Sequence, residues 1–261
     1  MKKYILITLT LSGLGLAIYA SAATYYVATT GLDTNPGTQS LPFKTIQKAA
    51  DIVNPGDVVI VLPGIYTQGV TTARAGTASA RIRFVSQQKW GAKIKTAGVQ
   101  YMWTNTADYM NIEGFEMTGD TRIAILNYAS HTRTLYNHIH HLGRADCTDY
   151  GAGDMGAGID HAGVSTGPDR FATDNDTIGN LLHDLSYHCP TIGAGQHAIY
   201  HAYGSGIIAN NIVYRSQAFG LHLYHNPYEV KVLNNISFNN KASGLVIGTD
   251  GRTGHLVRDI Y

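Results

Sequence analysis

A 24-residue spacing near the C-terminus constrains the fold of this chain more than any other feature. The segment Ile199-Tyr200-His201 returns as Leu223-Tyr224-His225, and the doublet Asn210-Asn211 returns as Asn234-Asn235, both after 24 residues. In each copy ten residues separate the His from the second Asn. A short unit that repeats at a constant period cannot bury an apolar face alone, so such units are typical of folds that stack them.

Composition and patterning favour strands over helices. The 261 residues include 29 Gly and 7 Pro, and 14% are charged, below the roughly 25% usual in globular proteins. In the last complete repeat we expect strands over 220–225, 229–234 and 236–238, a tight corner at Asn235, and the next coil from Gly244. The net charge of +1 and the lack of a basic run argue against nucleic acid or an anionic membrane as a partner.

The first residues have the features of a secretory signal. Lys2 and Lys3 precede an apolar stretch over 4–19, and Ala20-Ser21-Ala22 supplies the small residues of a signal peptidase site. We therefore expect residues 1–22 to be a signal peptide and residues 23–261 to be a single domain, secreted or periplasmic. An uncleaved membrane anchor is the alternative, although the apolar stretch is short and interrupted.

Export bears on the cysteines and on the state of the mature protein. Cys147 and Cys189 are the only two cysteines, and in an oxidising compartment we expect them to form a disulfide between two Gly-rich loops. These loops, over 144–156 and 187–195, interrupt the repeat and are expected to wall a groove. After signal cleavage we expect no membrane association, and we expect a monomer.

The N-terminal segment differs from the repeats. A strand is expected over 24–27, a turn over 33–37, a helix over 42–51 and a buried strand over 58–62. The helix has apolar residues at helical spacing and precedes the repeats. We expect it to cover the apolar interior that the first coil would otherwise expose.

Several N-terminal motifs resemble a known superfamily. They are Tyr25-Tyr26-Val27-Ala28, residues 33–37, residues 42–49, Pro55-Gly56-Asp57 and Gly64-Ile65-Tyr66. This run resembles the N-terminal cap of secreted right-handed parallel β-helix proteins of the pectate-lyase-like superfamily, which includes chondroitinase B and alginate lyases. The resemblance implies an all-β, right-handed parallel β-helix with an N-terminal capping helix, the cap lying at about residues 23–66, and a polysaccharide lyase activity.

The repeat predicts two columns of polar residues. The first column is Asn127, His161, His201, His225 and Thr249, and the second is Asn137, Asn180, Asn211 and Asn235. Neighbouring coils lie about 4.8 Å apart in a parallel sheet, so the members of a column should contact one another. Asn tolerates the left-handed backbone of tight corners and can satisfy corner backbone groups, so we interpret the second column as structural.

The first column invites a chemical hypothesis. Removal of the C5 proton of a uronic acid needs a base, an acid for the leaving oxygen and a cation that neutralises the carboxylate. Alternation places Leu221 and Leu223 inside and His222 and Tyr224 outside. The acid and base candidates are Tyr200, His201, Tyr224 and His225, flanked by His161, while Lys231 or Arg252 would neutralise the carboxylate and Asp160, Arg215 and His222 would contact the substrate. A structural ladder of neutral histidines is the alternative.

These residues leave several functions open. The leading hypothesis is a lyase that cleaves an acidic polysaccharide by β-elimination. A uronate C5-epimerase would share the proton abstraction, whereas a glycoside hydrolase would need two carboxylates, for which Asp160 and Asp250 are the pair that the sequence offers. A non-catalytic glycan-binding protein would use the 17 tyrosines for stacking on sugars.

Metal binding is a separate hypothesis. A group of nitrogen and sulfur ligands suits zinc or copper: His138, His140, His141, Cys147, His183, His188 and Cys189. His201 and His225, one repeat apart, could also bridge a metal. Calcium-dependent pectate lyases hold their ion with clustered acidic residues, and this sequence has no such run, so a divalent cation such as calcium stays open. The chain ends soon after the coil at Gly244, and we expect further coils to be missing.

Overall fold

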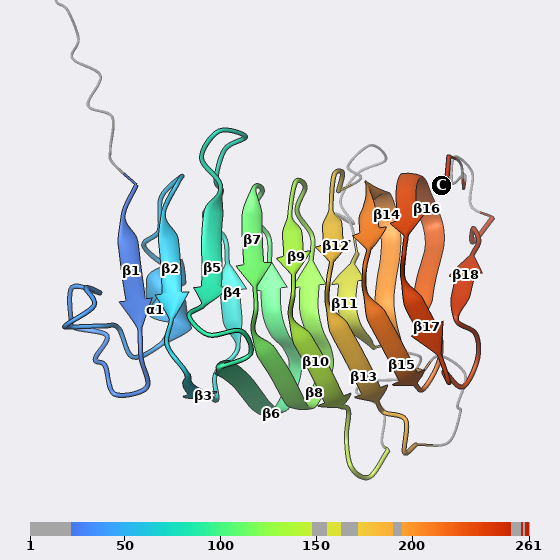
Figure 1. Ribbon diagram of the computed structural model, residues 1–261, viewed down its shortest axis with the longest axis horizontal. Coiled ribbons are helices and arrows are strands. Elements are labelled where there is room, and N and C mark those ends of the chain that lie inside the picture. The colour runs from blue at the N-terminus through green and yellow to red at the C-terminus, as the bar shows by residue number, and fades with distance from the viewer. Residues whose placement is uncertain are drawn as a thin grey trace, which may run out of the picture.

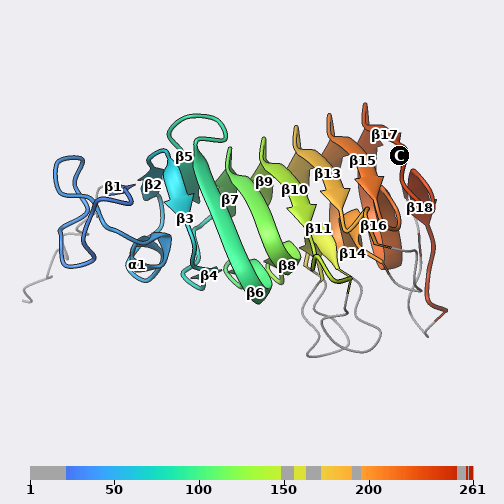
Figure 2. The ribbon, with the colours of Figure 1, turned by 90° about the horizontal axis from the view of Figure 1, so that it is seen from below.

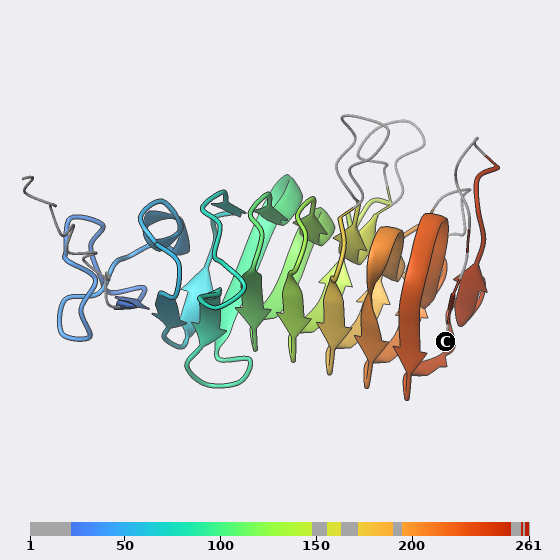
Figure 3. The same cartoon turned by 90° about the horizontal axis from the view of Figure 1, so that it is seen from above.

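The protein is described by a computed structural model that covers residues 22–147, 156–162, 172–189, 195–251, 257 and 259–260. The predicted signal peptide up to Ser21 and the candidate cation Arg252 lie outside these residues. The coils follow one another along the long axis, from β1 at the blue end to β18 at the red end (Figure 1). Figures 2 and 3 show the same stack of coils from below and from above.

Each coil contributes to three faces. The first face contains β1 (Thr24–Val27), β2 (Val58–Val61), β5 (Ile82–Ser86), β7 (Met110–Glu113), β9 (Arg133–Leu135), β12 (Asp176–Ile178) and the C-terminal parts of β14 (His197–Ala209) and β16 (Leu221–Leu233). The second contains β3 (Gly64–Tyr66), the N-terminal parts of β6 (Ala92–Asn105) and β8 (Glu116–Asn127), β10 (His138–Leu142), β13 (Leu181–Leu185), β15 (Ile212–Ser216) and β17 (Ile236–Phe238). The third contains β4 (Val70–Thr72), the C-terminal parts of β6 and β8, β11 (Ala157–His161), the N-terminal parts of β14 and β16, and β18 (Leu245–Ile247).

The pairing between these strands is parallel throughout. Consecutive coils place equivalent strands side by side on each face, as β11 does with β8 on one side and β14 on the other. The expected all-β, right-handed parallel β-helix is therefore confirmed. No helix of the described residues is long and apolar enough to cross a membrane.

The predicted repeat holds on the first and second faces and fails in part on the third. Ala209 pairs with Leu233, a spacing of 24 residues, and the strand over 236–238 lies where it was expected. His201, however, pairs with Leu223 and not with His225. Irregularities near Tyr203 and Gly206 take up the two-residue difference. The two Tyr-His pairs are therefore 24 residues apart in the sequence, but they occupy different positions in their coils.

The predicted Asn column is confirmed at the corner between the first and second faces. The amide of each Asn donates to the Oδ1 of the next, at 3.1 Å from Asn137 to Asn180, 3.0 Å from Asn180 to Asn211 and 2.9 Å from Asn211 to Asn235. The backbone N–H of each also donates to that Oδ1. The left-handed backbone lies one residue earlier than expected, as at Asn210 with a φ of 56°.

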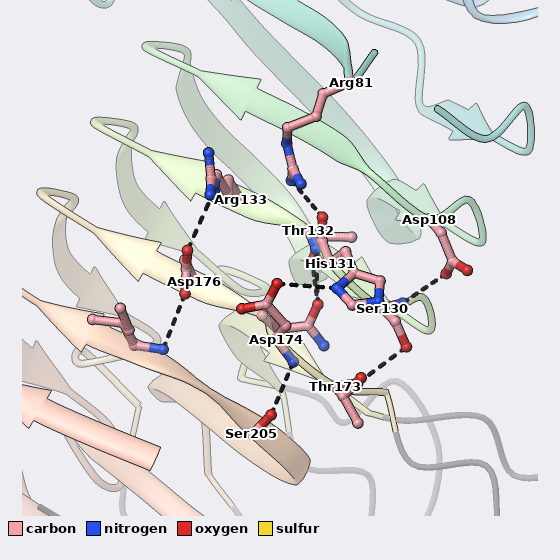
Figure 4. Close-up of polar contacts among 12 residues, drawn as sticks. Arg81, Asp108, Ser130, His131, Thr132, Arg133, Thr173, Asp174, Asp176 and Ser205 are labelled. Atoms are coloured by element: carbon pink, nitrogen blue, oxygen red, sulfur yellow. Dashed lines mark hydrogen bonds and ion pairs between the residues drawn. The ribbon is translucent and has the colours of Figure 1, made fainter. Parts of the chain in front are cut away.

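A second corner, between the third and first faces, is held by side chains that bond to the next coil (Figure 4). His131 stacks on Tyr109 at 4.4 Å, and its Nδ1 lies 3.0 Å from Asp174 Oδ2. The Ser130 Oγ accepts from the N–H of Thr173 at 3.0 Å. Tyr109, His131 and Asp174 all have a left-handed backbone, with φ values of 56° to 57°. The polar groups of the corner therefore satisfy one another along the axis, which accounts for their presence without a catalytic role.

The helix α1 (Ile46–Ala50) confirms the predicted helix, although it is shorter. Thr45 is its N-cap, and the Thr45 Oγ1 accepts from the N–H of Lys48 at 3.1 Å. Asp33 in turn accepts from the backbone N–H of Thr45 at 2.9 Å, which fixes the start of the helix. Ile46 and Ala49 pack into the apolar core. That the helix caps the coils stays a prediction.

Candidate active site on the third face

Polar residues from successive coils meet on the outer side of the third face. Asp160 on β11 pairs in register with Tyr200 on β14, and Tyr200 pairs with His222 on β16. The Tyr200 ring stacks on the His222 ring with centroids 4.8 Å apart. Because Ile159 and Leu221 belong to the apolar core, the residues that follow them point outward. We call this group the third-face site; its members are Asp160, Tyr200 and His222, together with Arg122, His197, Tyr224, His225 and Asp250.

Asp160 is a buried acid of this site whose pKa differs strongly from its ordinary value. The residue is 8% exposed, and among the described residues its Oδ1 has no hydrogen-bond partner. Burial raises the pKa of Asp160 to about 7, and the positive charge of Arg122 opposes that rise only in part. A carboxyl group that titrates near neutral pH can either donate or accept a proton, which makes Asp160 a candidate for acid-base chemistry.

Tyr200 lies beside this carboxyl. Its hydroxyl is buried and, within the part of the chain that the structure describes, has no hydrogen-bond partner. Burial raises the pKa of the Tyr200 phenol, and the charges of Asp160 and Asp250 raise it further. The phenol therefore keeps its proton at neutral pH. Both carboxyl groups therefore lie near enough to Tyr200 for their charges to act on its hydroxyl.

His225 and Asp250 form a pair at the end of the strand. The His225 Nδ1 lies 2.6 Å from Asp250 Oδ2, and the His225 ring stacks on Tyr203 with centroids 5.3 Å apart. The side chain of His225 is 21% exposed, and its ring lies 6.0 Å from that of Tyr200. A carboxylate on Nδ1 orients the ring and favours the tautomer with its lone pair on Nε2, as in a general base. Tyr224 contacts the same ring at 4.9 Å.

Two further residues, His197 and Arg122, belong to the third-face site and were not predicted from the sequence. His197 lies 3.3 Å from His222 between ring nitrogens and stacks on Phe219 at 5.2 Å. Burial lowers the pKa of His197 to about 3 and that of His222 to about 4, so both are neutral. Arg122 is a cation whose charge acts on Asp160, and its Nη1 lies 3.3 Å from the Tyr101 hydroxyl. A coil alignment at 22 residues, the offset between β14 and β16 on this face, brings His197 over Phe219 and would have placed it beside this site.

The structure corrects the roles expected of His161 and His201. Both are 0% exposed, because alternation points them into the interior of the coil. His161 accepts from the Asn127 amide at 3.1 Å and donates through Nε2 to the Thr177 hydroxyl at 2.8 Å. The His201 Nε2 lies 3.2 Å from the Gly204 carbonyl oxygen. The first predicted column therefore exists from Asn127 to His201. It lies in the interior of the coil, where a polysaccharide bound on the outer surface cannot reach it.

Other sequence-predicted residues lie away from the third-face site. Lys231 pairs with Ile207 on the first face, and Arg215 contacts Asp184 beside the second face. Neither accompanies Tyr200, so neither can neutralise a substrate bound there. A metal bridge between His201 and His225 is also excluded, because one ring is inside the coil and the other outside. The register adds the reason, since Leu223 occupies the place next to His201.

The predicted disulfide is confirmed. Cys147 and Cys189 are bonded, with their Cα atoms 5.4 Å apart, and the bond joins the segment after β10 to the segment after β13. His188 lies close to both sulfurs. Sulfurs in a disulfide are not thiolate ligands, so these cysteines do not contribute to a metal site while they are bonded.

Comparison with solved structures supports the fold. Pectate lyase Pel9A superposes with a TM-score of 0.58 at 18% identity, covering 88% of this chain and 61% of the lyase. The GH136 lacto-N-biosidase from Eubacterium ramulus gives 0.59 at 14% identity, covering 80% of this chain and 44% of the biosidase. A rhamnogalacturonan lyase gives 0.50 at 14% identity, covering 91% and 65%. This chain thus spans about half to two thirds of these proteins, and the identities support a shared fold alone.

Comparison with known sequences gives the family. A search of curated proteins found no match. A family model described as the Pel9A-like, right-handed β-helix region matches residues 25–166, which is more than half of the chain. This range begins at β1 and includes Asp160 of the third-face site. The chain belongs to the family of Pel9A-like right-handed β-helix regions.

Proposed function

We propose that the protein is a polysaccharide lyase that cleaves a uronic-acid-containing polymer by β-elimination at the third-face site. The observation that carries the proposal is the buried Asp160 carboxyl, with an Oδ1 that no described residue bonds, beside the equally unpartnered Tyr200 hydroxyl. Buried polar atoms without partners are costly, and a bound ligand would satisfy them. Pectate lyase Pel9A and the rhamnogalacturonan lyase share the scaffold, which favours this reaction.

The reaction can be assigned to residues of the site. Arg122 would neutralise the uronate carboxylate and the protonated form of Asp160 would donate a hydrogen bond to it, which makes the C5 proton more acidic. The His225 Nε2, oriented by Asp250, would accept that proton as the C4–C5 double bond forms. The C4–O4 bond would break, and the Tyr200 hydroxyl would donate its proton to the departing O4 oxygen.

The test is the ultraviolet absorbance of unsaturated uronate during incubation with alginate, pectate or a glycosaminoglycan. We expect a rise with one polymer, and a loss of roughly 100-fold or more in rate for Tyr200→Phe and for His225→Asn. Lys231→Ala, on the first face, is the matched control and should keep the wild-type rate. Absence of unsaturated product on every polymer would refute the proposal.

A glycoside hydrolase is the second candidate, because the charges of Asp160 and Asp250 both act on the pKa of Tyr200, so two carboxyl groups lie near one hydroxyl. Asp160, with its pKa of about 7, would be the acid and Asp250 the base or nucleophile. The lacto-N-biosidase, a glycoside hydrolase by name, has the same fold. New reducing ends without ultraviolet absorbance would favour hydrolysis over elimination.

We also propose that the protein acts outside the cytoplasm. The Cys147–Cys189 disulfide supports this location, since such bonds persist in oxidising compartments. An acidic polysaccharide is the partner that follows from the proposed reaction.

A further inference from the structure

A group of histidines lies on the outer side of the second face, separate from the third-face site. Its core, which we call the histidine patch, consists of Glu116 on β8, His138 and His140 on β10, and His183 on β13. These strands belong to three successive coils, because β10 pairs with β8 on one side and with β13 on the other. The register places His140 beside His183 and His138 beside Glu116.

The ring nitrogens of the patch converge. The Nε2 atoms of His138 and His183 lie 2.8 Å apart, and the His140 Nε2 lies 2.9 Å from Glu116 Oε1. One ligand atom from each of Glu116, His138 and His140 can be chosen so that all lie within 4.8 Å of one another. Ligand nitrogens around a tetrahedral zinc, with bonds of about 2.0 Å, lie about 3.3 Å apart. An ion between His138 and His183 would need their Nε2 atoms to move apart to this spacing and the Glu116–His140 pair to turn toward it.

The His183 ring has the second partner that metal-bound histidines usually have. Its Nδ1 lies 2.6 Å from Asp184 Oδ2, and Asp184 is itself held by Arg215. A carboxylate on Nδ1 fixes the proton there and turns the Nε2 lone pair toward His138. The same carboxylate makes the imidazole a stronger ligand. On the other side, Glu116 contacts Lys93 at 2.8 Å, a pair that an ion would have to replace or share.

We infer that the histidine patch binds one divalent transition-metal ion, with His138 and His183 as its central ligands and the Glu116–His140 pair completing the shell. Neutral imidazoles with one carboxylate suit zinc, copper or nickel better than calcium, which takes oxygen ligands. The ion joins three coils, because Glu116, His138 and His183 come from three consecutive strands of one face. It therefore stabilises the β-helix and is not part of the third-face chemistry.

A hydrogen bond is the alternative explanation of the short contact. His138 Nε2–H would donate to the His183 Nε2, and the pair would then be one more rung of a surface stack. Such a ring stack does continue from His183 toward the C-terminal coils. His183 stacks on Tyr214 with centroids 4.8 Å apart, and Tyr214 stacks on Phe238 at 5.0 Å. The two explanations differ in what they predict when metal is added.

The experiment uses the mature protein without a histidine tag, dialysed against a chelator and then titrated with Zn²⁺ by calorimetry. We expect one ion per chain, an affinity at least 100-fold lower in His138→Ala/His183→Ala, and a loss of 10- to 100-fold in Asp184→Asn. His131→Ala, at the corner shown in Figure 4, is the matched control and should bind as the wild type does. Binding that is unchanged in the double variant would overturn the inference.

A measurement on the intact chain guards against variants that do not fold. Co²⁺ in a four-coordinate nitrogen and oxygen site gives intense visible bands, whereas the hexa-aquo ion is pale. We expect intense bands and a melting temperature that rises with added Zn²⁺. A pale spectrum with no rise in melting temperature would also overturn the inference. Lyase activity is not used in either measurement, so the result is independent of the proposed function.

Discussion

Replacing Asp160 by Asn should make the stability of the protein less dependent on pH. The folded state raises the pKa of this carboxyl to about 7, from an ordinary value of 3.8. Between these values the folded chain holds a proton that the unfolded chain has released, so the free energy of unfolding falls as the pH rises through this range. Below pH 3.8 both states are protonated and the contribution is fully present. Asn carries no charge and escapes the loss.

The size of the effect follows from the two pKa values. They differ by about 3, and one pKa unit corresponds to about 1.36 kcal/mol, so the full loss is about 4 kcal/mol. Movement of Arg122 toward the ionised carboxylate would reduce this figure. We therefore expect Asp160→Asn to gain about 2–4 kcal/mol relative to the wild type between pH 4 and pH 8.

Urea unfolding followed by far-ultraviolet circular dichroism at pH 4, 6 and 8 provides the assay. Asp51→Asn is the matched control, because Asp51 is an exposed carboxyl at the end of α1 and should change the pH dependence far less. Parallel curves for Asp160→Asn and the wild type across this range would show that the folded Asp160 is not protonated near neutral pH. The acid-base role proposed for it would then lose its support.

Three further substitutions test the scaffold. Asn180→Ala removes a rung of the Asn column and takes away the Oδ1 that accepts from the Asn137 backbone N–H and side-chain amide, so urea unfolding should show a loss of about 2–4 kcal/mol, and a loss below 1 kcal/mol would contradict the ladder. Cys147→Ser opens a disulfide that spans 42 residues and should cost about 2–4 kcal/mol, measured in the same way against the wild type treated with reductant, which should match it. Gly158→Val would place Cβ 2.5 Å from a methyl of Leu182, so a lowered melting temperature is expected, and an unchanged value would mean that the core has room to spare.

The fold was predictable because corner chemistry repeats with the coil. Asn211 and Asn235 stand 24 residues apart in the sequence and bond to each other in the structure. A tight corner tolerates few residues and no insertion, so the sequence period and the spatial period coincide there. The strand over 236–238 follows such a corner and was placed correctly for that reason.

The candidate site was predictable only in part, because irregular backbone precedes it. The pairing of His201 with Leu223 depends on shifts near Tyr203 and Gly206 that no local pattern reveals. His201 was therefore aligned with His225 although it lies inside the coil beside Leu223, while the expected outward side of His222 agrees with the structure. Arg122 is separated from Asp160 by a whole coil and has no motif around it, so only the folded chain brings the two together.

The Asn column also limits how such a chain can change during evolution. Asn180 bonds backward to Asn137 and to the Thr134 carbonyl, and forward to Asn211, so every rung serves the coils on both sides. Loss or duplication of one entire turn rejoins equivalent rungs, whereas a single-residue deletion at the corner leaves two of them mismatched. Proteins with this corner should therefore differ in length by whole turns, and gradual variation should gather away from the corner.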